Sequence, residues 1–354
     1  MKRYLKNFRE RSTALKISPM SLIVLAACGR GNGRDVESSP SSSSLDVHGH
    51  AVKGPLASAL VFFDYNKNGV LDTGEPSTRT GSDGSYSLSQ SRPDFSITVI
   101  TDGNTIDTAS GIVLDGITLK APSNASVVTP TTTLIEEAGI TKEQVAEVLG
   151  LPEGVDLLSF NPYADGVDAA DALAVEKASQ QIMSVVNAFA GAAEGSGASE
   201  AEAFEAALSS VVEVVKTKAT NLNDANASAA DKTLDLTNSA DLALVKAEVV
   251  TKVAAETSAD TAAFDALADD TVTAVKNVNE KIATVDDLSS EEAKNTFSTT
   301  QVLADQTKQA AEAEVQNAGS GSIDFTDKTK VGDAADNKAP TDITLSKAAI
   351  AENA

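Results

Sequence analysis

The chain of 354 residues contains no tryptophan, one cysteine and two histidines, and only 4% of its residues are aromatic. The single cysteine excludes a disulfide framework, a cysteine-rich zinc site and an iron–sulfur cluster within one chain. The sequence also has no Gly-x-Ser-x-Gly, no phosphate-binding glycine loop, no His-Glu-x-x-His and no Cys/His pair. Its many carboxylates lack the aromatic platform that a sugar substrate needs, which argues against a glycosidase. We therefore expect a protein that is not an enzyme.

Basic residues are scarce and unevenly placed along the chain. There are 28 Lys and Arg against 51 Asp and Glu, which gives a formal net charge of −23. Residues 1–34 carry about +7, so the rest of the chain carries about −30. Phosphate contacts require Lys and Arg, so this charge argues against nucleic acid as a partner, whereas it attracts divalent cations. The alternative is that the charge reflects only the surface chemistry of a halophilic or marine protein.

Residues 1–27 have the pattern of an export signal. Basic residues precede an apolar stretch, Ile17 to Ala27, which is too short to span a bilayer. The stretch ends in Leu-Ala-Ala-Cys and resembles the bacterial lipobox, which implies cleavage before Cys28, acylation of that residue and a lipid anchor in the membrane. Gly29 resembles the next residue of lipoproteins exported to the outer membrane. The alternative is an ordinary secretory signal with an incidental cysteine. The Ser-rich residues 28–44 are expected to form a flexible tether.

Residues 64–75 have the spacing of a calcium-binding loop. Counting from Asp64, side chains with oxygen atoms occupy positions 1, 3, 5, 9 and 12, and Gly69 occupies position 6, where the turn is sharpest. A loop of this length can supply the roughly six to eight oxygen ligands that calcium prefers. The alternative is a hairpin rich in Asn, Asp and Gly that binds no ion. The expected ligands are the side chains of Asp64, Asn66, Asn68, Asp72 and Glu75 and the backbone carbonyl of Val70.

Residues 45–122 are expected to form a small β-sandwich, because short runs of strand-forming residues alternate with turns. Asp115-Gly116 between two apolar runs predicts a two-residue hairpin. His48 and His50 precede the first apolar run, and we expect them in an exposed linker rather than in a metal site. The runs expected as strands are 58–63, 77–80, 85–88, 95–100, 112–114 and 117–119.

Short motifs in this part of the chain support the same fold. They are Val-Lys-Gly-Pro-Leu at 52–56, Phe-Asp at 63–64, Gly-Glu-Pro at 74–76 and Asp-Gly-Ser-Tyr at 83–86. Together they resemble the transthyretin-like or carboxypeptidase-regulatory-like sandwich, and also the calcium-binding B repeats of Ser-Asp-repeat surface adhesins. The resemblance implies that the loop joins two strands, unlike the helix-loop-helix of an EF-hand. Pro76 agrees, because an apolar helix residue would follow the last ligand of an EF-hand.

Helical periodicity predominates beyond the strands. Residues 123–220 are expected to form a helical domain, with capping boxes at 141–144 and 199–202 and a break at the glycines within 191–197. Residues 221–318 are expected to form an Ala/Thr-rich helical bundle or stalk, with partial disorder as the alternative. Two apolar stripes there have a helical period: Leu242, Val245, Val249 and Val253, and then Phe264, Leu267, Val272, Val275, Val278 and Ile282.

Residues 319–354 are expected to form a linker followed by the start of a further module. The segment that begins at Asp336 resembles the linker and first strand of a bacterial cadherin-like repeat, in which Asn337 and Glu352 match calcium-binding positions. The segment is too short for a whole repeat. We therefore expect disordered termini and a longer natural protein. The alternative is a chance resemblance.

The expected fold class is α+β and multidomain, with a small sandwich that carries the calcium loop, followed by alanine-rich helices. We interpret the chain as a calcium-binding lipoprotein of the outer membrane or cell surface. It would have a structural or adhesive role, as the membrane-proximal part of a larger adhesin that binds a protein or cell-surface ligand. One alternative is an envelope lipoprotein that faces the periplasm and binds a protein partner through its helices. The other is a tether for a catalytic domain beyond Ala354.

Overall fold

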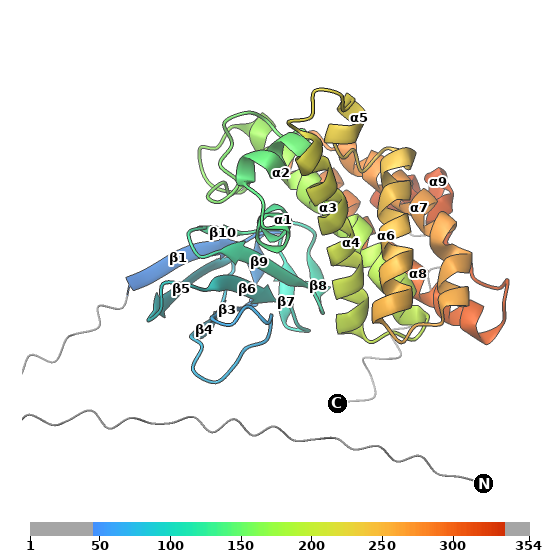
Figure 1. Ribbon diagram of the computed structural model, residues 1–354, viewed down its shortest axis with the longest axis horizontal. Coiled ribbons are helices and arrows are strands. Elements are labelled where there is room, and N and C mark those ends of the chain that lie inside the picture. The colour runs from blue at the N-terminus through green and yellow to red at the C-terminus, as the bar shows by residue number, and fades with distance from the viewer. Residues whose placement is uncertain (1–44, 337–354) are drawn as a thin grey trace, which may run out of the picture. The chain divides into compact units, whose positions relative to one another are not determined.

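The computed structural model describes residues 45–336, and all of these residues belong to one compact unit. Cys28, Asn337 and Glu352 lie outside the described residues, so the lipid anchor and the cadherin-like strand stay predictions. Strands come first along the described chain and helices follow (Figure 1). The expected α+β class is therefore confirmed.

The strands between residues 45 and 128 form three sheets. They are β1 (Leu45–Ala51), β2 (Leu56–Ala57), β3 (Leu60–Asp64), β4 (Ser77–Arg79), β5 (Ser85–Gln90), β6 (Ser96–Ile100), β7 (Thr105–Asp107), β8 (Ile112–Leu114), β9 (Thr118–Pro122) and β10 (Val127–Val128). β1 lies between β5, to which it is antiparallel, and β10, to which it is parallel. The second sheet has the order β4-β3-β6-β9, and the small third sheet has the order β2-β7-β8.

β3 forms the part of the four-stranded sheet that leads into the predicted calcium loop. Residues 61–63 of this strand are fully buried, and β4 and β6 pair with it on either side. The predicted run 58–63 is thus confirmed as a strand from Leu60 onward, because its bulky side chains pack on both faces of the sheet. Burial of β3 holds Asp64, its last residue, at a defined position.

The hairpin predicted at Asp115-Gly116 is wrong. β8 pairs with β7, whereas β9 pairs with β6, so the two strands that flank this turn belong to different sheets. Leu119 of β9 is buried and lies opposite Val99 of β6. The pairing is decided by burial of apolar side chains against β6, which a local turn signal does not reveal.

His48 and His50 lie within β1 rather than in a linker, which corrects the prediction. They lie opposite Ser87 and Ser85 of β5; His48 is exposed and His50 is half-buried. Alternate residues of a strand point to the same side, so both imidazoles belong to one face of β1. The strand begins earlier than its polar composition predicts, because β5 provides backbone partners along its length.

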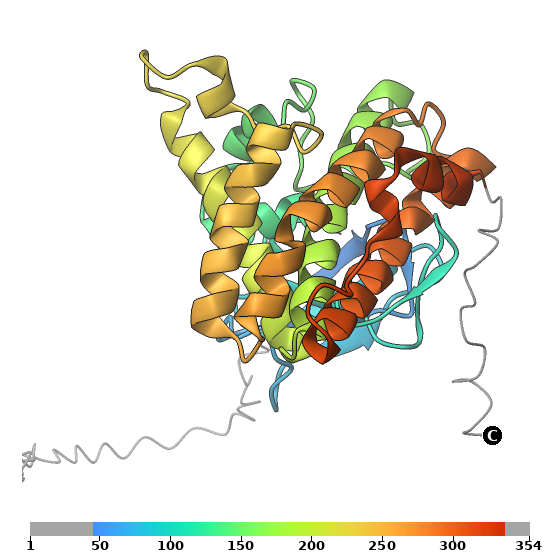
Figure 2. The ribbon, with the colours of Figure 1, turned by 90° about the vertical axis from the view of Figure 1, so that its right-hand side faces the viewer.

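The helices between residues 130 and 335 are packed side by side (Figure 2). They are α1 (Pro130–Ala138), α2 (Lys142–Val148), α3 (Ala169–Gly195), α4 (Glu200–Asn221), α5 (Ala229–Lys232), α6 (Ser239–Glu256), α7 (Thr261–Ala283), α8 (Glu291–Gln316), the 3-10 helix η1 (Asp324–Thr326) and α9 (Lys328–Ala335). α3 contacts α4, α7 and α8, and α6 contacts α4 and α7. Residues 221–318 are therefore helical for most of their length.

Local sequence signals predict several features of these helices correctly. Capping boxes at Thr141 and Ser199 begin α2 and α4 as expected. The first apolar stripe predicted in residues 221–318 is the complete buried face of α6. The second stripe lies within the buried face of α7, apart from Val272, which is half-buried.

α3 continues through Gly191, where a break was expected, and ends at Gly195. The close approach of α8 explains both glycines. A Cβ atom at Gly191 would lie 2.4 Å from the Ala304 carbonyl oxygen, and one at Gly195 would lie 2.1 Å from the Lys308 carbonyl oxygen. Both distances are well below van der Waals contact. Glycine at these positions therefore permits the close packing of α3 on α8, and Gly191 does not end the helix.

The predicted linker at the end of the described chain contains η1 and α9. Ile323, Phe325 and Val331 are buried, and the Asn277 side chain of α7 donates a hydrogen bond to the Phe325 carbonyl at 2.9 Å. η1 contacts α7, and α9 contacts α7 and α8. The three apolar side chains hold the segment in place, although the Gly, Ser and Asp residues around them are typical of a linker.

We expect Gly191→Ala to lower the free energy of unfolding by about 1–3 kcal/mol, because the added methyl group meets the backbone of α8. Gly332→Ala in α9 is a matched control, since no atom lies within 4 Å of its added carbon. This control should raise the free energy of unfolding by about 0.5–1 kcal/mol, because alanine loses less backbone entropy than glycine on folding. Denaturant titration gives the sign of the change in the free energy of unfolding for each variant. If both variants are more stable than the unchanged protein, the close approach of α3 and α8 is contradicted.

Candidate functional site

The predicted calcium loop connects β3 to β4, and aromatic contacts hold its beginning. Asp64 is fully buried at the end of β3. The Tyr65 and Phe95 rings meet edge to face with their centroids 6.3 Å apart, and the Arg92 guanidinium lies 4.7 Å from the Tyr65 ring centroid. The first residues of the loop are therefore attached to the segment that precedes β6.

The Asp64 carboxylate organises the first half of the loop. Its Oδ1 accepts a hydrogen bond from the Asn68 N–H at 3.2 Å, and its Oδ2 accepts one from the Gly69 N–H at 2.6 Å. Lys67 and Gly69, at positions 4 and 6, have positive φ angles of 59° and 75°. These left-handed residues turn the backbone sharply, so that neighbouring N–H groups point toward one carboxylate. Glycine accepts this conformation without steric cost.

Glu75 closes the second half of the loop. Its Oε1 accepts a hydrogen bond from the Tyr65 N–H at 2.8 Å, and its Oε2 accepts one from the Asp72 N–H, also at 2.8 Å. The Glu75 N–H in turn donates to the Asp72 carbonyl at 3.2 Å. The carboxylate at position 12 thus bridges the start and the end of the loop.

The remaining predicted ligands meet at Asp72. Its Oδ2 accepts hydrogen bonds from the side-chain amides of Asn66 at 2.8 Å and Asn68 at 2.9 Å. The Asn68 Oδ1 accepts from the Val70 N–H at 2.8 Å, and the Val70 side chain is exposed. Hydrogen bonds therefore link all the residues predicted as ligands within one loop.

The loop carboxylates do not converge on one point. Among residues 45–336, no group of three or more His, Cys, Asp or Glu side chains is placed so that it could hold a metal ion. Asp64 and Glu75 face backbone N–H groups, and Asp72 faces side-chain amides. The six calcium ligands therefore stay a prediction.

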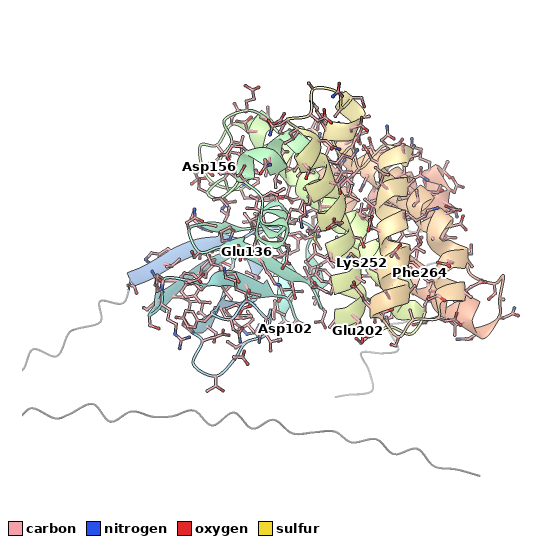
Figure 3. All side chains as sticks on the ribbon, viewed as in Figure 1. Asp102, Glu136, Asp156, Glu202, Lys252 and Phe264 are labelled. Carbon is pink, nitrogen blue, oxygen red and sulfur yellow. The ribbon has the colours of Figure 1, made fainter. Side chains whose placement is uncertain are left out.

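The loop carries three carboxylates that are not balanced by basic side chains. In the part of the chain that the structure describes, no Lys or Arg forms an ion pair with them. Lys67 lies 3.3 Å from Asp94 and 3.9 Å from Glu136 of α1, which Figure 3 labels. Lys120, whose amine lies beside Gly69, pairs with Glu137 at 2.6 Å. The donor set of carboxylate and amide oxygens suits a hard cation such as calcium.

A second polar cluster lies in the interior, where the strands meet α3. The Lys53 ammonium lies 3.5 Å from the Asp107 carboxylate, and both side chains are at most 2% exposed. The Asp107 Oδ1 accepts from the Ala109 N–H at 2.9 Å, and its Oδ2 accepts from the Ser110 hydroxyl at 2.8 Å. This ion pair is therefore supported by further hydrogen bonds, as a buried pair requires.

Glu176 of α3 completes this cluster. Its Oε1 accepts hydrogen bonds from the Gly54 N–H at 3.0 Å and the Gln180 side-chain amide at 2.7 Å. Burial, with a smaller contribution from the Asp107 charge, raises the pKa of Glu176 to about 7. The buried Tyr163 hydroxyl is close enough for the charge of Glu176 to raise its pKa further, yet it makes no hydrogen bond of normal geometry. The cluster joins the turn at Lys53 to α3.

The sequence pattern does not identify this cluster as a site, although one signal is present. Glu176 and Gln180 lie one turn apart, on the same side of α3 as the buried Ala172 and Met183. Two polar residues on an apolar stripe indicate a buried polar contact, because an unpaired charge there would be costly. Lys53 gives no comparable signal, since a lysine beside glycine in a turn is usually exposed.

Comparisons of the chain with protein-family models, with curated proteins and with solved structures give no match. In residues 45–336, no helix combines the length and the apolar character needed to cross a membrane. The chemistry of the calcium loop and of the buried cluster is therefore the basis for a functional proposal.

We expect Glu176→Gln to change how stability depends on pH. The folded state binds the Glu176 proton more tightly than the unfolded state, whose pKa is near 4.5. The resulting stabilisation is complete below about pH 4.5 and is lost as the pH rises through about 7, where the charged carboxylate costs about 3 kcal/mol. Gln keeps an acceptor for the Gly54 N–H and carries no charge. The variant should therefore be about 3 kcal/mol more stable than the unchanged protein above about pH 8.

The matched control for this variant is Glu213→Gln, at an exposed position of α4. Denaturant titrations at about pH 5 and pH 8.5 should show that only Glu176→Gln alters the difference in stability between the two conditions. A Glu176→Gln protein that loses stability between these pH values as steeply as the unchanged protein would contradict the assignment.

Proposed function

We propose that the loop from Asp64 to Glu75 binds calcium and thereby stabilises a β-sandwich, built from the three sheets of residues 45–128, in a lipid-anchored cell-surface protein. The supporting observation is the loop itself. Its predicted ligands are linked by hydrogen bonds, and its three carboxylates have no basic partner in the described residues. Like charges confined to twelve residues repel one another, and a divalent cation removes that repulsion.

The expected ligands have distinct roles in this proposal. Asp64, Asp72 and Glu75 supply negative charge, and the Val70 carbonyl supplies a neutral oxygen. Asn66 and Asn68 present their NH₂ groups to Asp72, and half a turn of each side-chain amide exchanges nitrogen for oxygen. Such a rotation gives up the hydrogen bonds that the two amide oxygens accept from the Asn68 and Val70 N–H groups. In this proposal, bonds to the ion replace them.

The role proposed for calcium is structural rather than regulatory. Strands flank the loop on both sides, as the antiparallel pairing of β3 with β4 demonstrates, so there is no helix pair to open when calcium binds. Extracellular calcium modules bind with dissociation constants of roughly 10⁻⁴–10⁻³ M. A site of this affinity is filled outside the cell and would not sense small changes in calcium.

The proposed cellular location depends on residues that precede the described part of the chain. The basic, apolar and small residues before Cys28 occur in the order that a lipoprotein signal requires. The Ser-rich residues 28–44 would separate the lipid from the first strand. An adhesive or structural role suits a stabilised module displayed at a surface, with a protein or cell-surface ligand as its partner.

Calcium at about 10 mM should raise the free energy of unfolding of the full chain by about 1.5–3 kcal/mol, because it binds only the folded loop. Asp72→Asn should reduce this gain by at least half, since it removes one charge from the ligand set. Asp94→Asn is the matched control, because Asp94 lies near the loop at Lys67 but at no ligand position. Thermal and denaturant unfolding with calcium, magnesium or chelator provides the measurement. The site is refuted if calcium leaves the unchanged protein unaffected.

Replacing Cys28 by Ser should move the protein from the membrane fraction to the soluble fraction, because the residue that carries the acyl chains is lost. Incorporation of a labelled fatty acid should disappear in the same variant. Digestion of intact cells by an added protease should cut the unchanged protein if it is displayed on the surface. Complete resistance to the protease would instead support the periplasm-facing alternative.

A further inference from the structure

A cavity of about 210 Å³ lies where the turn between β8 and β9 meets α3, α4 and α8. It is distinct from the calcium loop and from the buried Lys53 cluster, with which it shares no residue. Its volume is below the range of about 300–1,000 Å³ that is usual for drug-sized ligands. The cavity is therefore suited to a small molecule or to a single side chain.

The lining of the cavity carries an excess of negative charge. Asp115 of the turn, Glu200 at the start of α4, and Glu194 and Asp305 of α3 and α8 all line it. Glu194 forms an ion pair with Lys308 of α8. In the described part of the chain, the other three carboxylates form no ion pair with Lys or Arg, although the charge of Lys308 acts on Glu200 and Asp305. Four carboxylates and one ammonium group therefore line one small cavity.

The surroundings of two of these carboxylates favour a cationic guest. Burial raises the pKa of Asp305, and burial together with the charges of Asp115 and Glu194 raises the pKa of Glu200. The Gln301 side-chain amide donates to the Asp305 Oδ1 at 3.1 Å. A cation in the cavity would reverse these shifts, because an opposite charge favours the ionised carboxylate.

Asn187 of α3 provides an independent indication of a ligand. Its side chain lines the cavity and is only 7% exposed, yet it forms no hydrogen bond with any described residue. The amide of Asn187 is thus left to interact with whatever occupies the cavity. A ligand with N–H donors could bind the Asn187 oxygen there.

The residues that line the cavity suit an organic cation better than a metal ion. The carboxylates are not gathered closely enough to hold a metal, as noted above for residues 45–336. Between them lie apolar groups, among them Ala190, Ala304 and the Phe204 ring. An aromatic face attracts an ammonium or a guanidinium group, and the small apolar side chains leave space for a short hydrocarbon chain.

We propose that this cavity binds a small organic cation, a protonated amine or a guanidinium group, through Asp115, Glu200 and Asp305 and the oxygen of Asn187. The same chemistry is offered by a free amine and by a Lys or Arg side chain of a peptide. The proposal does not depend on calcium binding, since the two sites have no residue in common.

The test is titration calorimetry of the full chain with agmatine and putrescine in about 0.15 M salt. 1,4-Butanediol, which has the same carbon chain as putrescine but no charge, is the control ligand. We expect heat of binding with the two cations and none with the diol. Asp305→Asn should weaken cation binding at least tenfold, and Asn187→Ala should weaken it by a similar factor. Glu213→Gln, which removes a carboxylate from an exposed position of α4, should leave it unchanged.

Further outcomes would overturn the proposal or identify the source of the ligand. Equal loss of affinity in Glu213→Gln and Asp305→Asn would overturn the site, because it would reveal general attraction of cations to an acidic protein. Unchanged affinity in both cavity variants would also overturn it. Tighter binding of acetyl-arginine amide than of agmatine would support a protein side chain as the natural ligand, whereas the reverse order would support a free amine.

Discussion

The hydrogen bond from the Gly54 N–H to the Glu176 carboxyl joins the two kinds of structure in this protein, because it connects a turn between strands to α3. A Cβ atom at Gly54 would lie 2.0 Å from the Asp107 carboxylate, so this glycine also makes room for the ion pair with Lys53. Burying three ionisable groups is expensive. The attraction of Lys53 to the two carboxylates offsets that cost only when the geometry is good. We infer that the cluster contributes mainly to specificity: it defines where α3 lies against the strands, and α3 in turn contacts α4, α7 and α8.

The predicted calcium loop is connected to the helices by a separate set of contacts. Lys67 at position 4 of the loop reaches Glu136 of α1, whose pKa is raised by burial. The hydroxyl groups of Thr132 and Thr133 at the start of α1 donate to the carbonyl of Lys120 in β9 at 3.0 Å and 3.2 Å. The loop, the edge of the four-stranded sheet and the first helix are thus bonded to one another.

Features set by neighbouring residues were predicted well, and features set by distant residues were not. The capping boxes at Thr141 and Ser199, the stripe of α6 and the sharp turn at Gly69 depend on residues within a few positions of each other. The pairing of β9 with β6, the passage of α3 through Gly191 and the Gly54–Glu176 contact depend on partners far along the chain, 122 positions apart in the last case. Sequence spacing also located the loop of the candidate site, whose calcium ligands stay a prediction. It could not indicate that hydrogen bonds would link those side chains around Asp72, nor that Asn187 and four carboxylates from three helices and a turn would line one cavity.

α3 contributes to both of the charged regions that lie apart from the calcium loop. Glu176 belongs to the buried cluster near its beginning and Glu194 to the cavity near its end, which is eighteen residues later in the chain. At a rise of about 1.5 Å per residue the two carboxylates are about 27 Å apart along the helix axis. This is more than three screening lengths at physiological ionic strength, where one length is about 8 Å. A proton gained at Glu176 and a cation bound beside Glu194 would therefore barely sense each other through solvent. Two parts of the described chain connect the two regions: α3 itself, and the pair β7 and β8, which leads from Asp107 of the cluster to the turn with Asp115.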